Sequence, residues 1–390
     1  MNFVHQALAH AGKRKEVSPG ERLEIAVDLA LAHDGSAGQV LDAWEAGSYP
    51  GVFDGSRVIF TLDHLLPAPT VVARTLHLRM QEFARRNSVL IYHRGEGVLH
   101  QVVAEEHRPR PGMILAAADG HVATAGAFGA LGFSVKPGDL AAIMATGRMV
   151  LEVPEVIAVE VTGRLQPGVM ARDLALWLLD HFGATGLKGK VLALAGSAVW
   201  GLSEAGKMAL CNMTGEMGAA TGLIVPPESV GDPPVLKVEA TKVAPLIACP
   251  GSPPVIRPAK ELAGTLVTQV LVGGCSSGRL EDMEALMAAL GGRLVHPRVN
   301  LLVVPASRAV ANKMEEDGLA RYLRKAGAVI TSPGCGPCPG LHAGLLAVGE
   351  RAVAATVRNT PGRMGSDQAE IFLASPRIAG LAACAGEIQV

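Results

Sequence analysis

The chain has 390 residues, of which 49% are hydrophobic and 18% are charged, and its formal net charge at pH 7 is -1. This composition excludes a disordered chain, and without a basic stripe there is no electrostatic reason to expect a nucleic acid partner. Apolar runs end before the roughly 20 residues that a membrane span needs, and the start, MNFVHQALAHAGKRKEV, lacks the apolar region of a secretion signal. We therefore expect a cytoplasmic protein of two or three domains that contacts neither nucleic acid nor membrane.

Strand-like and helix-like patterns alternate along the chain. A turn leading into a strand is predicted over 20–32 (GERLEIAVDLALA), and an amphipathic helix over 70–86. Short runs rich in Val, Ile and Leu predict buried parallel strands at Val58–Leu62, Val191–Leu194 and Leu301–Val304. Further helices are predicted over 171–183, 203–211, 279–290 and 308–326. Strands that alternate with helices predict an α/β architecture.

Two proline-rich stretches divide this pattern. Residues 225–235 (VPPESVGDPPV) and 250–258 (PGSPPVIRP) are predicted to be loops or linkers, because proline removes a backbone donor and resists the helix. We expect domain boundaries near residues 153 and 248. The predicted domains are 1–152, 153–248 and 249–390.

Six cysteines without a dense pairing pattern fit reduced thiols or metal ligands better than a disulfide framework. Cys275 lies in VGGCSSGRLEDME, and Cys335 and Cys338 lie in TSPGCGPCPG. A loop of the second kind can direct two sulfurs and several backbone N–H groups at one centre, as iron–sulfur sites require. Cys275 precedes a helix predicted to begin near Arg279, and a sulfur at a helix N-terminus favours the thiolate.

The same cysteines allow other interpretations. A lone CxxC is also typical of a zinc knuckle or a redox pair. Structural zinc takes four protein ligands, however, and neither a second CxxC nor a paired His completes the set. Three cysteines with one open metal position suit a cluster whose remaining iron binds substrate. The other three, Cys211, Cys249 and Cys384, are expected to pack as small apolar residues.

Several motifs in a fixed order resemble the aconitase family. GCSSGRLED, then GCGPC about 60 residues later, then VRNTPGR are similar to the cluster-binding half of that family. The upstream motifs HDGSAGQ, TLDH, GEGVLHQVVAEE, DGHVATAGAFGALG and GSAVWGLSEAGKMALCNMTGEMGA stand in family order. In length and layout the chain resembles the large subunits of isopropylmalate isomerase and homoaconitase. The resemblance implies three α/β domains around an iron–sulfur cluster, without the swivelling fourth domain.

The resemblance also implies roles for individual residues. Cys275, Cys335 and Cys338 would hold a [4Fe–4S] cluster, leaving one iron free to act as a Lewis acid on a substrate hydroxyl and carboxylate. Three carboxylate–imidazole pairs are implied: Asp63 with His64, Asp119 with His100, and Glu216 with His121. Such pairing raises the basicity of an imidazole and orients it, and His64 is expected to protonate the departing hydroxyl. The implied substrate-binding residues are Gln39, Asn212, Arg358 and Arg363, the arginines gripping carboxylates.

Each of these residues has an ordinary interpretation when taken singly. An Asp-His dipeptide such as Asp63–His64 is common, Glu216 could lie on a solvated helix face, and Arg358 could be a surface charge. The interpretation therefore rests on the ordered set.

Some positions depart from the family pattern. Asp-Ser-His-Thr is replaced by Asp119-Gly120-His121-Val122, and Cys-Thr-Asn by Cys275-Ser276-Ser277. Val357 replaces an Asn before the first arginine, and the second domain is shortened between about 228 and 245. Substrate-facing polar groups are thus lost while the cysteines and the acid–histidine pairs remain. This combination predicts altered substrate specificity rather than loss of function.

The family takes its proton-abstracting serine from a small swivelling domain. The chain ends at Val390, where the family's large subunits also end, so the resemblance implies a separate small subunit that supplies this serine. The expected reaction is reversible dehydration of a hydroxy di- or tricarboxylic acid, with rehydration in an isomerase. Alternatives are a hydratase of a methylated maleate-type acid, a cluster-bearing regulatory protein, and a zinc-stabilised non-catalytic module. A regulatory protein does not need the proton relays that His64, His100 and His121 would provide.

Overall fold

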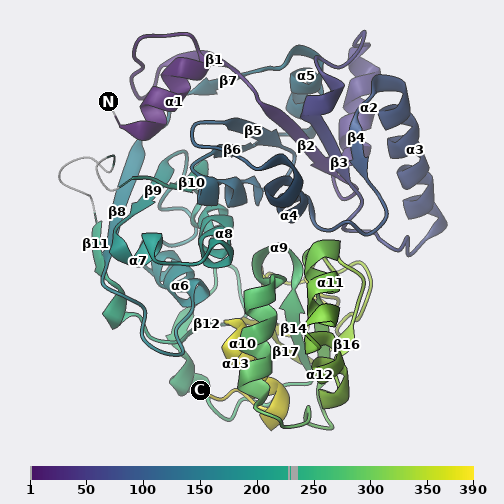
Figure 1. The fold of residues 1–390 in the computed structure, drawn as a ribbon, viewed down its shortest axis with the longest axis vertical. Coiled ribbons are helices and arrows are strands. Elements are labelled where there is room, and N and C mark those ends of the chain that lie inside the picture. The colour runs from purple at the N-terminus through teal and green to yellow at the C-terminus, as the bar shows by residue number, and fades with distance from the viewer. Residues whose placement is uncertain (1, 227–228, 230–235) are drawn as a thin grey trace.

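The computed structural model describes residues 2–226, 229 and 236–390, whose strands form three larger sheets and one two-stranded ribbon. Figure 1 shows the three sheets side by side, each coloured by a different part of the chain. The α/β architecture predicted from the sequence is confirmed.

The first sheet is parallel and has five strands in the order β4-β3-β2-β5-β6. Its strands are β2 (Leu29–His33), β3 (Val58–Thr61), β4 (Leu90–Tyr92), β5 (Ile114–Ala117) and β6 (Leu131–Ser134). The helices of this part are α1 (Phe3–Ala11), α2 (Ala37–Gly47), α3 (Val71–Asn87), α4 (Leu99–Val102) and α5 (Pro137–Thr146), with short turns η1 (Gly55–Arg57), η2 (Val103–His107) and η3 (Val122–Phe128). The helix predicted over 70–86 is α3, and Thr70 caps its first turn.

The single strand predicted within 20–32 is wrong, because the chain forms two strands there. β1 (Arg22–Ala26) pairs antiparallel with β7 (Arg148–Glu152), whereas β2 lies in the first sheet. The burial pattern explains the division. Residues of β1 alternate between exposed and buried, as on a strand with one solvated face, while every residue of β2 is buried.

The second sheet is parallel and has four strands in the order β10-β9-β8-β11. Its strands are β8 (Val156–Thr162), β9 (Val191–Ala195), β10 (Thr221–Ile224) and β11 (Leu236–Glu239). The helices are α6 (Ala171–Phe182), α7 (Ser197–Trp200) and α8 (Glu204–Asn212), with turns η4 (Thr214–Met217) and η6 (Ala240–Lys242). Most of the loop predicted over 225–235 lies outside the described residues.

The third sheet has seven strands in the order β13-β12-β18-β17-β14-β15-β16. β12 pairs antiparallel with β13 and with β18, and the other neighbouring strands of this sheet pair parallel. Its strands are β12 (Leu246–Ala248), β13 (Ile256–Pro258), β14 (Gln269–Gly273), β15 (Asn300–Val304), β16 (Val329–Ile330), β17 (Arg351–Ala355) and β18 (Glu370–Leu373). The helices are α9 (Gly274–Ser277), α10 (Leu280–Leu290), α11 (Arg308–Glu316), α12 (Leu319–Ala326) and α13 (Pro376–Ala385), with turn η7 (Ala259–Leu262).

Two predictions for this part need correction. The helix expected over 308–326 is divided into α11 and α12, because Gly318 adopts a left-handed conformation with φ of 73°. The loop expected over 250–258 ends in β13. This strand lies at the edge of the sheet, where the missing N–H of Pro258 is tolerated.

The division into three domains stays a prediction. The strands of the three sheets follow one another along the chain, and the boundary predicted near 153 falls between β7 and β8. The boundary predicted at 248 falls at the end of β12, which already belongs to the third sheet.

The carboxyl ends of parallel strands face the junction of the sheets. His33 ends β2, while Asp63 and Asp119 lie two residues after β3 and β5. Cys275 lies two residues after β14, and Arg358 three residues after β17. In α/β sheets ligands bind at such ends. Figure 1 shows α4, α8 and α9 meeting near this junction.

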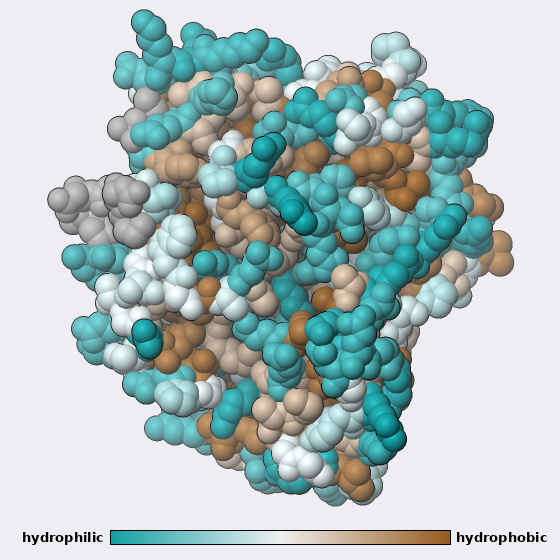
Figure 2. Space-filling model, viewed as in Figure 1, coloured by the Kyte–Doolittle hydropathy of each residue, from teal (hydrophilic) through white to brown (hydrophobic). Residues whose placement is uncertain are grey.

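The helices of the described residues include no candidate membrane span. No helix there is both long enough and apolar enough to cross a bilayer. Hydrophilic and hydrophobic residues are interspersed over the face in Figure 2.

Candidate active site

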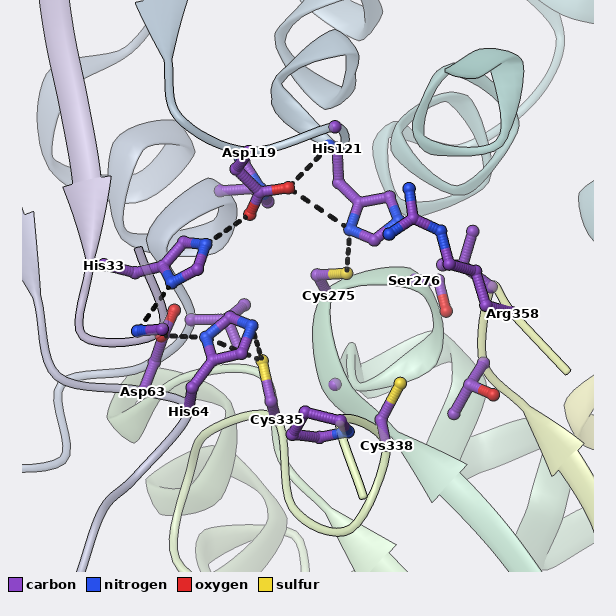
Figure 3. A pocket seen from close by; sticks show the side chains of 18 of the residues that line it. His33, Asp63, His64, Asp119, His121, Cys275, Ser276, Cys335, Cys338 and Arg358 are labelled. Atoms are coloured by element: carbon purple, nitrogen blue, oxygen red, sulfur yellow. Dashed lines mark hydrogen bonds and ion pairs between the residues drawn. The ribbon is translucent and has the colours of Figure 1, made fainter. Parts of the chain in front are cut away.

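A cavity of about 340 Å³ lies at this junction. Its walls include His33, Asp63, His64, His100, Asp119 and His121 from the first part of the chain, and Cys275, Cys335, Cys338, Arg358 and Arg363 from the third. Figure 3 shows the cysteine sulfurs among these side chains. Most of the residues predicted from the sequence therefore meet in one place, although they are far apart along the chain.

Asp63 and His64 form a close pair. The Oδ1 atom of Asp63 lies 2.6 Å from Nδ1 of His64, and its Oδ2 atom accepts a hydrogen bond of 2.7 Å from the N–H of Leu99. Burial disfavours both charges, but the pairing outweighs it: the pKa of His64 is raised to about 9 and the pKa of Asp63 is lowered to about 2. At neutral pH His64 is therefore an imidazolium.

Asp119 connects several histidines. Its Oδ2 atom lies 3.0 Å from Nε2 of His100 and 3.0 Å from Nε2 of His33, while Oδ1 accepts a 2.7 Å hydrogen bond from the N–H of His121. Burial opposes its charge, yet His100 and His33 hold the pKa of Asp119 well below its usual value. The sequence analysis missed His33. The signal available was its place as the first residue of HDGSAGQ, directly at the end of a buried strand.

His121 lies between Glu216 and Cys275. Its Nε2 atom is 3.6 Å from Oε1 of Glu216, and its Nδ1 atom is 4.0 Å from the sulfur of Cys275. Burial opposes charge, but Cys275 and Glu216 raise the pKa of His121 well above its usual value. Likewise, burial would raise the pKa of Cys275, but His121 lowers it to about 7. Arg358 donates from Nε to Oε1 of Glu216 at 2.8 Å. The contacts therefore continue from Cys275 through His121 and Glu216 to Arg358.

The loop that carries Cys335 and Cys338 is held against the first part of the chain. The N–H of Cys335 donates to the carbonyl of Asp63 at 2.9 Å, and Nε2 of His342 lies 2.7 Å from the carbonyl of His64. Gly336 has φ of 57°, and a Cβ there would lie 2.7 Å from Val304, so the turn requires glycine. The sulfur of Cys335 thereby comes to 3.7 Å from Nδ1 of His64.

The cysteine at the third sheet has a different setting from the one predicted. Cys275 is the second residue of α9 (Gly274–Ser277), a separate turn of helix with Gly278 as its C-cap, and lies five residues before the start of α10. The sulfur therefore lies at the start of a helix, as predicted, but this helix is the short α9 and not the longer helix expected near Arg279. The lowered pKa of Cys275 arises from His121 instead.

The three thiols fit an inorganic cluster better than a single zinc ion. All six cysteines lie within the described residues, and none forms a disulfide. Zn–S bonds of about 2.3 Å would bring the ligand sulfurs of one tetrahedral zinc within about 4 Å of one another. Within the described chain, the groups of three or more ligand atoms that lie within 4.8 Å of one another contain histidines and carboxylates only. The sulfurs of Cys275, Cys335 and Cys338 line one cavity without forming such a group, so their arrangement fits a centre larger than one zinc ion.

The remaining predicted residues differ in their placement. Asn212 is buried and donates to Thr124 at 2.7 Å and to the Cys275 sulfur at 3.5 Å, while its Oδ1 atom has no hydrogen-bond partner. Arg363 lines the cavity. Gln39 is exposed on α2 and does not line it, so the structure does not bring this residue to the site.

A second residue that the sequence analysis missed is Asp34. Its carboxylate accepts hydrogen bonds from the N–H groups of His64 at 2.8 Å and Leu65 at 2.9 Å, and it lies 3.0 Å from Nε2 of His77. These contacts fix the backbone that presents His64.

The departures from the family pattern change the cavity wall. A Cβ at Gly120 would lie 2.9 Å from a terminal nitrogen of Arg358, so the missing side chain leaves room for this guanidinium. Val357 is buried beside it. The hydroxyl of Ser277 accepts a 3.0 Å hydrogen bond from Arg172, which burial leaves with a pKa lowered to about 10.

The other cysteines lie away from the cavity. Cys211 is fully buried, and burial raises the pKa of its thiol to about 12. Cys249 and Cys384 are partly buried against the apolar core of the third sheet. These three side chains pack as small apolar residues, as predicted.

Comparison with known proteins agrees with the motifs. The model of the aconitase family (aconitate hydratase) matches residues 13–232 and 236–386. A 3-isopropylmalate dehydratase large subunit of Methanopyrus kandleri is 37% identical, over 96% of this chain and 95% of its own length. A probable methanogen homoaconitase large subunit of Methanosarcina mazei is 39% identical, over 93% of this chain and 97% of its own.

A solved structure supports the fold. The holo-form of aconitase X from Thermococcus kodakaraensis superposes with a TM-score of 0.53 at 14% sequence identity, covering 92% of this chain and 89% of that one. The predicted aconitase-like fold is thereby confirmed. The chain belongs to the aconitase family, a family of hydro-lyases.

Proposed function

We propose that this chain is the large, cluster-carrying subunit of a [4Fe–4S]-dependent hydro-lyase of the isopropylmalate dehydratase or homoaconitase type. Its substrate class is a hydroxy di- or tricarboxylic acid, which it dehydrates and hydrates reversibly. The observation that carries the proposal is that Cys275, Cys335 and Cys338 line the same cavity as His64 and His121, each of which is paired with a carboxylate.

A cluster held by these cysteines would supply Lewis-acid chemistry to a hydroxyl and a carboxylate of the substrate. His64 holds a proton at neutral pH, because its pKa is about 9. Since Asp63 occupies Nδ1, the Nε2 atom of His64 is the one that can give a proton to a departing hydroxyl. His100 and His121 are oriented by Asp119 and Glu216 to hold water or protons nearby.

Two arginines on the cavity wall can bind the substrate's carboxylates. Arg358 uses Nε for Glu216, which leaves its terminal nitrogens for a ligand, and Arg363 lies on the same wall. Gly120 and Val357 offer no hydrogen-bonding side chain where the family has Ser and Asn. We therefore propose that the substrate differs from that of the named relatives by lacking a polar group at this position.

The cluster is tested first. Purified without oxygen, the chain should show the broad visible absorption of an iron–sulfur cluster, with matching iron and sulfide contents. Replacing Cys275, Cys335 or Cys338 by Ser should abolish this absorption, while the matched control Cys384→Ser should keep it. A colourless protein that resists reconstitution, or one that binds zinc instead, would contradict the proposal.

The reaction is tested with the partner. The named relatives are large subunits, and we propose that a small subunit completes the cleft of this chain and supplies the base serine. Together the two chains, both cytoplasmic in this proposal, should convert 3-isopropylmalate or a related hydroxy acid to an unsaturated acid, followed by its ultraviolet absorption. A methylated maleate-type acid in the same screen tests simple hydration. Full activity of the chain alone would refute the need for the partner.

A further inference from the structure

We infer that His33 is a positioning residue that connects the Asp63–His64 pair to the Asp119–His100 pair, an inference that rests on the proposed function. His33 ends β2, the central strand of the first sheet, and is only 6% exposed. Its ring lies on the cavity wall between the two pairs, and Figure 3 shows it between the side chains of His64 and Asp119.

The hydrogen bonds of His33 define its protonation state. Its Nδ1 atom accepts a 3.0 Å hydrogen bond from the N–H of Gly35, so this nitrogen carries no proton. Its Nε2 atom lies 3.0 Å from Oδ2 of Asp119 and must be the donor of that bond. His33 is therefore a neutral imidazole with its proton on Nε2.

The ring of His33 also supports His64. The two rings are stacked, with centroids 3.9 Å apart and planes inclined by 12°. Gly35 makes the stack possible, because a Cβ there would lie 2.9 Å from the His33 ring and 3.2 Å from the His64 ring. The hydrogen bond that Nδ1 of His64 donates to Asp63 fixes the rotation of His64. The stack fixes the plane of the His64 ring, and a neutral neighbour adds no second positive charge.

On its other side His33 shares one acceptor with His100. Both imidazoles lie 3.0 Å from the same Oδ2 atom of Asp119. A movement of His33 would shift this carboxylate, and with it His100 and the backbone of His121, which donates to Oδ1. One buried ring thus determines the orientation of groups in both pairs.

His33 itself has no nitrogen left for chemistry. Nδ1 of His33 accepts from Gly35 and its Nε2 donates to Asp119. Nε2 of His64, in contrast, has no carboxylate partner among the described residues and lies 3.8 Å from the sulfur of Cys335 in the cavity. The role that follows for His33 is to hold other groups rather than to transfer a proton to substrate.

Two substitutions separate the two contacts. His33→Phe keeps a ring to stack on His64 but removes the donor to Asp119. His33→Gln keeps an amide donor but removes the stack. In the cluster-loaded complex with the small subunit, each should lower kcat by about 10- to 100-fold while KM changes little, since substrate groups are untouched.

The matched control is His5→Gln. His5 is also buried, at 8% exposed, and its Nε2 atom lies 3.0 Å from the carbonyl of Pro154, but it does not line the cavity. This variant should keep the wild-type kcat. All variants should keep the visible absorption of the cluster, because none of the changed residues is a cysteine.

A second measurement does not depend on activity. In the cluster-free wild-type chain labelled with ¹⁵N and ¹³C in histidine, His33 should show the neutral Nε2–H tautomer by NMR. In His33→Gln, the ring resonances of His64 should shift, because the stacked ring is gone. The tautomer is measured on the wild-type chain, so a variant that fails to fold does not prevent the test.

The outcomes separate the two proposals. If the wild-type complex is active but both His33 variants match it in kcat, or if His33 carries its proton on Nδ1, the positioning role is refuted and the proposed function stands. A cluster-loaded wild-type complex inactive on every hydroxy acid tested would refute the proposed function and the role that rests on it.

Discussion

Replacing Gly126 by Ala should test how closely the first and second sheets meet. Gly126 lies in η3, directly after the segment that carries Asp119 and His121, and is buried against β10. A Cβ there would lie 1.9 Å from the carbonyl oxygen of Gly222, whereas ordinary contact begins at 3.4 Å. The two backbones would therefore have to separate by about 1.5 Å.

The cost of this substitution follows from the atoms involved. Overpacking a buried site typically costs about 1–3 kcal/mol. Both sides of this contact are backbone, so no side chain can rotate away, and we expect about 3 kcal/mol of lost stability. Because Thr124 of the same turn accepts the hydrogen bond from Asn212, the loss should extend to the cavity.

Urea unfolding of the cluster-free chain would measure this loss. The matched control is Gly138→Ala, at an exposed helical position of α5 where no heavy atom lies within 4 Å of the added Cβ. That variant should gain about 0.5–1 kcal/mol, because alanine favours the helix. If Gly126→Ala unfolds within about 0.5 kcal/mol of the wild type, the inferred backbone contact is wrong.

Three further predictions concern the framework around the site. Burial raises the pKa of Asp173 to about 6 from 3.8, so the folded chain binds this proton more tightly than the unfolded chain. This tighter proton binding stabilises the folded chain by about 1.4 kcal/mol per pKa unit, or about 3 kcal/mol in all. The stabilisation is fully present below about pH 4 and is lost as the pH rises through 6. Asp173→Asn should lack this loss, and equal pH slopes of urea unfolding in both proteins would contradict the reasoning. Thr70→Ala removes the 3.1 Å hydrogen bond that the Thr70 hydroxyl accepts from the N–H of Ala73, and should lower the free energy of unfolding by about 1 kcal/mol. The control Thr75→Ala, within the same helix, should not lower it in the same urea unfolding. Asn359→Ala leaves the buried carbonyls of Cys249 and Ile371 without this donor and should cost about 1–3 kcal/mol, measured by the same unfolding; an unchanged midpoint would show that the bonds contribute nothing.

Patterns within a short stretch predicted the elements well. The helix α3 and the strands β3, β9 and β15 lie where periodicity and apolar runs placed them. Local spacing failed in two places, once because of strand pairing and once because of a left-handed glycine. The segment 20–32 divides because β1 and β2 enter different sheets, and 308–326 divides at Gly318.

The candidate site also contains residues that local motifs predicted and residues that only the tertiary structure brought together. Asp63 and His64 are neighbours in sequence, and the cysteine loop is one motif, so both could be recognised within the ordered set of family motifs. His33 was missed, because its role depends on Asp119, which follows another strand of the first sheet. Gln39, in contrast, belongs to a recognised motif, yet α2 directs it to the exposed surface.

The order of motifs along the chain was therefore enough to recognise the family and its cysteines, because residue types and local spacings are written in the sequence itself. The resemblance also implied the three acid–histidine pairs. Only the tertiary structure decided that His33 shares Asp119 with His100, that Arg358 reaches Glu216 past Gly120, and that His33 stacks on His64. His33 ends one strand of the first sheet and His64 and Asp119 follow two others, whereas Arg358 follows a strand of the third sheet and Glu216 lies in η4. Their distances depend on how whole sheets pack, which no local pattern of residues specifies.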